Sequence, residues 1–237
     1  GHSLLRWYVM GEAAWERAAT PAEIAELCAV LDEQLQAGAF GLSTSFADKD
    51  HLGRMVPSVQ ADDAEFAALT EVLARHGGLL EFVPNLSGGT AFDDIDRMGR
   101  ICGPRGVTCT WNTLGQSKRA PERAGQFLAQ ATRQQAEGIK IYPQGSPRTF
   151  DLRINWSRSV LFQDMATSWA LFIKAEGDDK AAMLRDPEWR ARARQEWDGA
   201  KLSPFPTWDI SRLRFIVVSR PELESWVGRT LADLVAE

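Results

Sequence analysis

Hydrophobic residues follow two alternating spacings along the N-terminal part of the chain. In the longer stretches they recur every third or fourth position, and each stretch is followed by a short, almost wholly apolar run. The first spacing is typical of amphipathic helices, and the second of strands buried on both faces. The pattern predicts helices over residues 21–37, 62–76, 92–102 and 121–137. It predicts strands over residues 39–44, 79–83, 107–111 and 139–142.

Helix-terminating and helix-capping residues support these boundaries. Thr20 is followed by Pro21 and Glu23, an arrangement that predicts a capping box at the start of the first helix. Gly38 ends that helix, and the pair Gly77–Gly78 ends the next one. Each βα step spans roughly thirty residues, which is the size of a βαβ unit.

Strict alternation of strands and helices predicts a parallel sheet with helices outside it. No strand is followed by GxGxxG or GxxxxGK[ST], so a nucleotide-binding doubly wound fold lacks support. We therefore predict the α/β class, and within it part of a (β/α)₈ TIM-type barrel.

The pattern changes after residue 142. Residues 144–159 are polar and turn-rich, and 202–208 hold two prolines that require irregular backbone. Two helices are predicted over 161–175 and 186–197, a fifth strand over 213–218, and a last helix over 221–236.

These elements are interpreted as one partial barrel domain over residues 1–237, with a helical insertion at about 147–206. Five strands do not close an eight-stranded barrel, and an open sheet leaves two unpaired edges. We therefore expect barrel strands to be missing at both ends of the chain.

Composition narrows the choice of partners. Lys and Arg number 27 and Asp and Glu 32, giving a net charge of -5, which argues against a nucleic-acid partner. No stretch reaches about 18 consecutive apolar residues, so no membrane partner is expected. The three cysteines form no CxxC, which favours a reduced, cytoplasmic location.

Ligands bind at the carboxyl ends of barrel strands, and polar residues lie there in this sequence. Glu81 lies inside an apolar strand, so it is either a substrate-binding group or one half of an ion pair with Lys140. Trp111 and Asn112 are candidates to line a pocket. The alternative for Trp111 is that its indole packs under a loop. Tyr142 closes the fourth strand and is a further substrate-binding candidate.

Two motifs resemble a known family. They are GHSLLR over residues 1–6, followed by VMGE over 9–12, and AGAFGLSTS over 37–45. The chain resembles the N-acyl-D-amino-acid deacylases of the amidohydrolase superfamily, and the resemblance extends in order over most of its length. It implies a metal-dependent barrel that hydrolyses the amide of an N-acylated D-amino acid, together with a small β-domain built from both chain ends.

The resemblance also implies zinc or a similar divalent metal, held by ligands outside this chain. The family places metal-binding histidines near the positions of Val83 and Trp111, and neither residue is a ligand. The family's general base, an Asp on the last strand, would lie beyond Glu237. No metal ligand and no catalytic residue is therefore assigned within this sequence.

Two more substrate-binding candidates depend on the family. An N-acyl amino acid carries a carboxylate that a guanidinium can bind through two hydrogen bonds, which makes Arg148 a candidate anchor; the alternative is a surface arginine beside Asp151. His2 lies in the first motif and is assigned either to substrate binding or to packing.

Three functional hypotheses follow. The first is a segment of a metal-dependent amidohydrolase that acts on a small-molecule amide, with the rest of the barrel as its structural partner. The second is a catalytically degenerate barrel that binds a small acidic ligand. The third is a complete small α/β protein.

Overall fold

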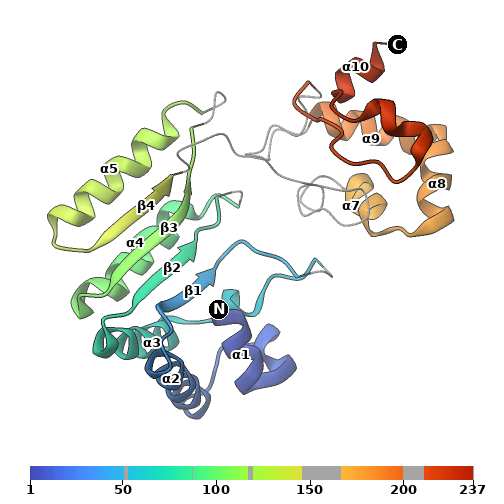
Figure 1. Cartoon of the computed structure of the whole chain (residues 1–237). Coiled ribbons are helices and arrows are strands. Elements are labelled where there is room, and N and C mark those ends of the chain that lie inside the picture. The colour runs from blue at the N-terminus through green and yellow to red at the C-terminus, as the bar shows by residue number, and fades with distance from the viewer. Residues whose placement is uncertain (51–52, 87, 117–119, 146–166, 200–210, 237) are drawn as a thin grey trace. The chain divides into compact units, whose positions relative to one another are not determined.

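The computed structural model describes residues 1–50, 53–86, 88–116, 120–145, 167–199 and 211–236 (Figure 1). The chain divides into two compact units, Gly1–Leu152 and Arg153–Glu237. Each unit has a hydrophobic cluster of its own. Residues 167–199 of the predicted insertion at 147–206 are described, whereas 147–166 and 200–206 lie outside the described residues. The assignment of a single domain stays a prediction.

The first unit is a parallel sheet with helices beside it (Figure 1). Its strands are β1 Gly41–Ser45, β2 Leu79–Val83, β3 Thr108–Leu114 and β4 Ile141–Gly145. Its helices are α1 His2–Met10, α2 Pro21–Gln36, α3 Asp63–His76, α4 Ala91–Cys102 and α5 Arg123–Ala136. Short 3₁₀ helices cover Gly11–Trp15, Pro57–Gln60 and Gly103–Arg105. The strand order β1-β2-β3-β4 confirms the predicted parallel α/β arrangement.

Local sequence explains where these elements begin and end. The Thr20 hydroxyl accepts from the Glu23 amide at 3.3 Å, and the Glu23 carboxylate accepts from the Thr20 amide at 2.7 Å, as the capping box predicts. Helix α3 begins after Asp62, whose carboxylate accepts from the Glu65 amide at 2.9 Å. It ends at Gly77, whose φ of 62° is a left-handed conformation that glycine adopts without steric cost.

Helix α1 was not predicted, and its buried face explains why. That face carries His2 and Arg6 beside Leu5 and Met10. Polar residues at buried positions interrupt the apolar periodicity by which amphipathic helices are recognised. The helix therefore depends on polar contacts that the pattern of hydrophobic residues cannot reveal.

The two faces of the sheet differ in chemistry. Alternate residues of a strand point to opposite faces. One face carries the buried residues Leu42, Leu80, Phe82, Cys109, Trp111 and Ile141, which join the hydrophobic core of the first unit. The opposite face carries residues that, apart from the buried Ser45 at the end of β1, are exposed or half-buried, and it is called the open face below.

Strands β1 and β2 approach closely at one glycine. A Cβ atom added to Gly41 would lie 2.1 Å from the carbonyl oxygen of Leu79, its partner in register. No side chain fits at that distance, so the pairing of these strands requires glycine at this position.

Among the described residues of the second unit, three helices surround a group of aromatic side chains. They are α7 Thr167–Lys174, α8 Gly177–Arg185 and α9 Pro187–Gly199, and α9 confirms the helix predicted over 186–197. Phe172, Ile173, Trp189 and Ala193 form the buried cluster. The Trp169 indole packs on it and donates a hydrogen bond to the Ala193 carbonyl at 2.9 Å.

The strand predicted over 213–218 is wrong. Its backbone pairs with residues close by in sequence: Phe215 donates to Arg229 at 2.9 Å, and Arg214 forms an isolated antiparallel bridge with Thr230. The last helix, predicted over 221–236, is replaced by a 3₁₀ turn Pro221–Trp226 and a short helix α10 Leu231–Val235. Gly228, with φ of 88°, separates the two, and Thr230 starts a new capping box.

Among the described helices, none combines the length and the apolar character that crossing a bilayer requires.

Candidate functional site

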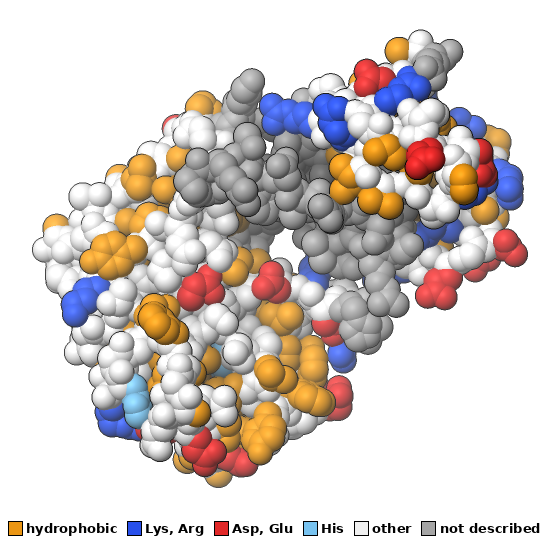
Figure 2. All heavy atoms as spheres, in the orientation of Figure 1, with side chains coloured by type: hydrophobic (Ala, Val, Ile, Leu, Met, Phe, Trp, Pro, Cys, Tyr) orange, Lys and Arg blue, Asp and Glu red, His pale blue; other side chains and the backbone are white. Residues whose placement is uncertain are grey.

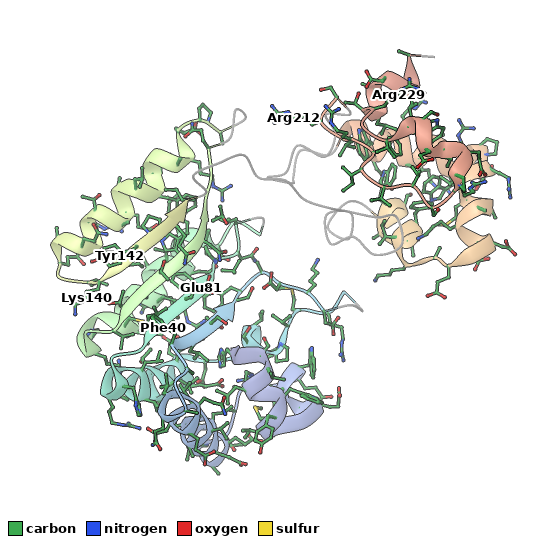
Figure 3. All side chains as sticks on the ribbon, in the orientation of Figure 1. Phe40, Glu81, Lys140, Tyr142, Arg212 and Arg229 are labelled. Atoms are coloured by element: carbon green, nitrogen blue, oxygen red, sulfur yellow. The ribbon has the colours of Figure 1, made fainter. Side chains whose placement is uncertain are left out.

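Polar side chains form a row across the open face of the sheet. Ser43, Glu81, Thr110 and Tyr142 are partners in register on four successive strands. Ser43 and Tyr142 are exposed, whereas Glu81 and Thr110 are half-buried. Figure 3 labels Glu81 and Tyr142, and Figure 2 shows acidic side chains at the surface in the region of the strands.

Hydrogen bonds join this row to the next residues toward the carboxyl ends of the strands. The Asn112 amide donates to the Glu81 carboxylate at 2.6 Å, so two predicted site residues do lie together. The Gln144 amide donates to the Thr110 hydroxyl at 3.0 Å, and that hydroxyl donates to the Tyr142 carbonyl at 2.9 Å. The open face therefore presents two hydrogen-bonded groups, one of Glu81 and Asn112 and one of Thr110, Tyr142 and Gln144.

The alternative ion pair between Glu81 and Lys140 is not formed. The Lys140 ammonium instead donates to the Gly106 carbonyl at 3.4 Å. Lys140 precedes β4, whereas Glu81 lies in the middle of β2, so the lysine belongs to the amino end of the sheet.

The environment of Glu81 raises its pKa. Partial burial disfavours the charged carboxylate, and the negative charge of Asp48 adds to this effect. The hydrogen bond from Asn112 opposes both by favouring the ionised form. A carboxyl group with a perturbed pKa on a polar face of a sheet is a candidate for contact with a ligand.

Trp111 lies on the opposite side of the sheet from Glu81 and Asn112. Its side chain is fully buried in the core, with its ring 5.3 Å from that of Phe127 on α5. The prediction that Trp111 lines a pocket together with Asn112 is therefore wrong for this structure. Adjacent residues of a strand face opposite ways, so the sequence did contain the signal that separates these two side chains.

His2 is buried as well, with 1% of its surface exposed. Its Nδ1 lies 2.9 Å from the Thr44 hydroxyl, and its Nε2 lies 2.7 Å from the Glu65 carboxylate. Burial lowers the pKa of His2, and this effect outweighs the opposing influence of Glu65. A ligand on the open face cannot touch this imidazole, so of its two assignments the packing role describes this structure.

Glu65 is the centre of a buried polar cluster that the sequence did not reveal. Its carboxylate also accepts from the Arg6 guanidinium, which in turn donates to the Arg17 carbonyl at 2.7 Å. Burial alone would raise the pKa of Glu65, but the hydrogen bonds and charges of His2 and Arg6 together lower it. Glu65 lies in the first turn of α3, where an acidic residue is ordinary, so no sequence signal marked it.

Of the two remaining candidates, Tyr142 and Arg148, the structure describes only Tyr142. Tyr142 is 51% exposed on the open face, where it is free to meet a ligand. Arg148 lies outside the described residues, so its role as a carboxylate anchor stays a prediction.

The described residues do not fit a metal site. Within the described ranges there is no group of three or more His, Cys, Asp or Glu side chains placed to hold an ion. Structural and catalytic zinc sites use at least three protein ligands. Val83, the residue near a histidine position of the resembled family, is an apolar side chain at the end of β2.

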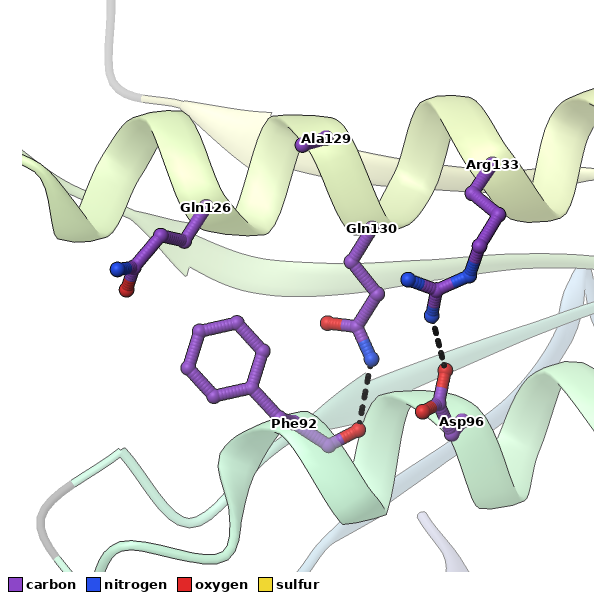
Figure 4. A pocket seen from close by; sticks show the side chains of 6 residues that line it. All are labelled: Phe92, Asp96, Gln126, Ala129, Gln130 and Arg133. Carbon is purple, nitrogen blue, oxygen red and sulfur yellow. Dashed lines mark hydrogen bonds and ion pairs between the residues drawn. The ribbon is translucent and has the colours of Figure 1, made fainter.

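A groove on the helical side is not part of this site. It lies between α4 and α5, measures about 380 Å³ and is lined by Phe92, Asp96 and Arg133, among others (Figure 4). The Gln130 amide donates to the Phe92 carbonyl across it at 2.8 Å, and Arg133 pairs with Asp96 at 3.3 Å. These contacts join the two helices, on the side of the sheet away from Glu81.

Comparison with known proteins gives relatives at low identity. No family model matches the chain. Uncharacterized proteins of Mycobacterium tuberculosis and Mycobacterium bovis are 26% identical to it over 249 residues. The matches include 100% of this chain and 40% of each relative, so the chain spans about 40% of the length of these curated relatives.

Solved structures give a clearer likeness. D-aminoacylase, described as defining a subset of amidohydrolases, superposes with a TM-score of 0.52 and 25% identity, over 62% of this chain and 29% of its own. One of its structures contains copper chloride, and another concerns its binuclear metal centre. An N-acyl-D-glutamate deacylase from Bordetella bronchiseptica superposes less well, with a TM-score of 0.49. The likeness to D-aminoacylase confirms the resemblance found in the sequence motifs and the predicted amidohydrolase type of fold.

Proposed function

We propose that the full-length protein is a metal-dependent amidohydrolase that hydrolyses a non-peptide amide bond, such as that of an N-acyl-D-amino acid. The observation that carries this proposal is the likeness of the fold to D-aminoacylase, an amidohydrolase with a binuclear metal centre. Because the likeness covers 29% of that enzyme, the activity is proposed for the whole protein rather than for this chain alone.

The part played by this chain is to bind and orient the substrate from the open face. Glu81 and Asn112 offer a carboxyl group and an amide held together at 2.6 Å. Ser43 and the exposed Tyr142 extend this polar surface on either side. Such groups can hydrogen-bond both the N–H and the carbonyl of an amide, which fixes its orientation before reaction.

The metal would activate water and polarise the amide carbonyl. The described residues supply no ligand set for it, so the proposal places its ligands elsewhere in the full-length protein. Arg148 is proposed to bind the carboxylate of an N-acyl amino acid.

Amide hydrolysis by the full-length protein tests this function. A panel of N-acetyl-D- and N-acetyl-L-amino acids is assayed for release of free amine, and turnover of a D-substrate is expected. Replacing Glu81 by Gln removes a charged hydrogen-bond partner of the substrate, which should lower kcat/KM roughly ten- to a hundred-fold.

The matched control is Glu71→Gln on α3. Glu71 is 58% exposed and pairs with Arg105 at 2.7 Å, on the helical side of the sheet. Its replacement should leave kcat/KM unchanged. An equal decrease of kcat/KM in both variants would show that Glu81 has no specific role in the reaction.

A second candidate function is binding without turnover. It is favoured by the lack of a three-ligand cluster among the described residues. A degenerate barrel of this kind would bind a small acidic ligand, and its full-length form would release no amine from any member of the panel.

A further inference from the structure

The segment that follows β1 passes the carboxyl end of β2, where the Phe46 amide donates to the Val83 carbonyl at 2.9 Å, and leads to Asp48. Its start is fixed by Ser45, whose hydroxyl accepts from the backbone amides of Ala47 at 3.2 Å and Asp48 at 3.0 Å. The Asp48 carbonyl accepts from the Val56 amide at 3.1 Å. Asp48 is thus held through both of its backbone polar groups, while its side chain stays exposed.

Ser45 is itself held by a buried hydroxyl. Ser58 has no exposed surface, and its hydroxyl donates to the Ser45 carbonyl at 2.8 Å. The Ser3 hydroxyl donates to Ser58 at 3.0 Å and accepts from the Ser58 amide at 3.2 Å. A chain of hydrogen bonds therefore runs from Ser3 through Ser58 and Ser45 to Asp48.

This chain joins the two sequence motifs that carry the family resemblance. Ser3 lies in the first motif and Ser45 in the second, and His2 adds a parallel link to Thr44. Ser58 lies in neither motif, in the 3₁₀ helix Pro57–Gln60. Through Ser58, Ser3 of the first motif is linked to Ser45 of the second.

We propose that Ser58 is a positioning residue, which holds the Asp48 segment beside Glu81 through Ser45 and thereby sets the electrostatic environment of the open face. This inference rests on the proposed function for its importance to substrate, because that function assigns Glu81 to substrate binding. The arrangement it describes can be tested without a substrate.

The surroundings of Glu81 make it a usable reporter. Its partners in register, Ser43 and Thr110, are uncharged hydroxyls, and Asn112 is a neutral amide. Asp48 is the charged group among the described residues that acts on Glu81, and it raises the pKa of that carboxyl group. A displacement of Asp48 should therefore lower the pKa of Glu81.

The experiment is a carbon-13 NMR titration of glutamate carboxyl groups in the full-length protein, with the Glu81 signal assigned through Glu81→Gln. Asp48→Asn should lower the pKa of Glu81, and Ser58→Ala should lower it in the same direction. The double variant should match Asp48→Asn alone, because Ser58 acts only through Asp48. Thr70→Val is the control: Thr70 is an equally buried hydroxyl, but it bonds the Phe66 carbonyl within α3.

An unchanged pKa in Ser58→Ala, with a lowered one in Asp48→Asn, would overturn the proposal. Additive effects in the double variant would overturn it as well. If Ser58→Ala does not fold, Ser3→Ala breaks the same chain one step earlier, at a half-buried residue, and is judged by the same criteria. None of these outcomes depends on hydrolysis, so a protein without amidase activity would refute the proposed function and leave the positioning role to be decided by the titration.

Discussion

Replacing Glu65 by Gln should be among the most damaging single changes in the first unit. Glu65 and Arg6 are an ion pair with no exposed side-chain surface on either partner, and His2 completes the contact. The neutral amide cannot compensate the guanidinium, which stays buried without a counter-charge. The imidazole also loses a charged acceptor at 2.7 Å.

The size of the loss follows from burial. Removing one partner of a buried ion pair costs about 3–5 kcal/mol, because the remaining charge is left desolvated. An exposed pair contributes about 0–1 kcal/mol. Asp63 provides that comparison on the same helix: it pairs with Arg97 at 2.6 Å, and its side chain is 59% exposed.

Urea unfolding of the full-length protein, followed by circular dichroism, measures both effects. We expect Glu65→Gln to lower the free energy of unfolding by about 3–5 kcal/mol, and Asp63→Asn to lower it by less than about 1 kcal/mol. Similar losses in the two variants would refute the view that the buried cluster anchors α1 to α3 and β1.

Two other predictions concern the pH dependence of stability and the effect of replacing glycine by alanine. Because burial holds the pKa of His2 below its usual 6.5, the unfolded chain binds a proton that the folded protein rejects, so stability should fall as the pH drops below that value. Because the pKa of Glu65 is lowered as well, the free energy of unfolding should fall further below pH 4.5. In His2→Gln, the urea midpoint should depend less on pH between 6.5 and 4.5, where His2 is the group that titrates on unfolding. Gly41→Ala forces a Cβ against the Leu79 carbonyl and should cost about 1–3 kcal/mol or more. Gly125→Ala, with open space at its Cβ position on α5, should instead raise the free energy of unfolding by about 0.5–1 kcal/mol. Thermal denaturation of both variants checks the pair, and a stable Gly41→Ala protein would contradict the close approach of β1 and β2.

The strands of the first unit could be predicted because their apolar runs are bounded by strong local signals. The capping box at Thr20 and the glycine at position 77 act within a few residues, so sequence alone locates them. The run 213–218 has a similar composition, but its backbone pairs with residues near Arg229. Strand composition does not identify the pairing partner, because pairing depends on which chain segments meet in three dimensions.

The candidate site, too, could be predicted from the sequence only in part. Glu81 and Asn112 were found because polar residues at the ends of parallel strands converge. The prediction for Trp111 is wrong because neighbouring residues of β3 face opposite sides of the sheet, so a site that includes Asn112 excludes the Trp111 side chain. The partner of His2 could not be predicted, since Glu65 lies 63 residues away in sequence and meets it only through the packing of α3 against α1.

Metal-dependent amide hydrolysis is best tested by measuring the metal content of the purified full-length protein after dialysis, together with its hydrolytic activity. We expect a tightly bound divalent ion, hydrolysis of an N-acyl-D-amino acid, and loss of that activity on chelation with recovery when zinc is added. A protein that retains no metal and releases amine equally well in the presence of chelator would contradict it.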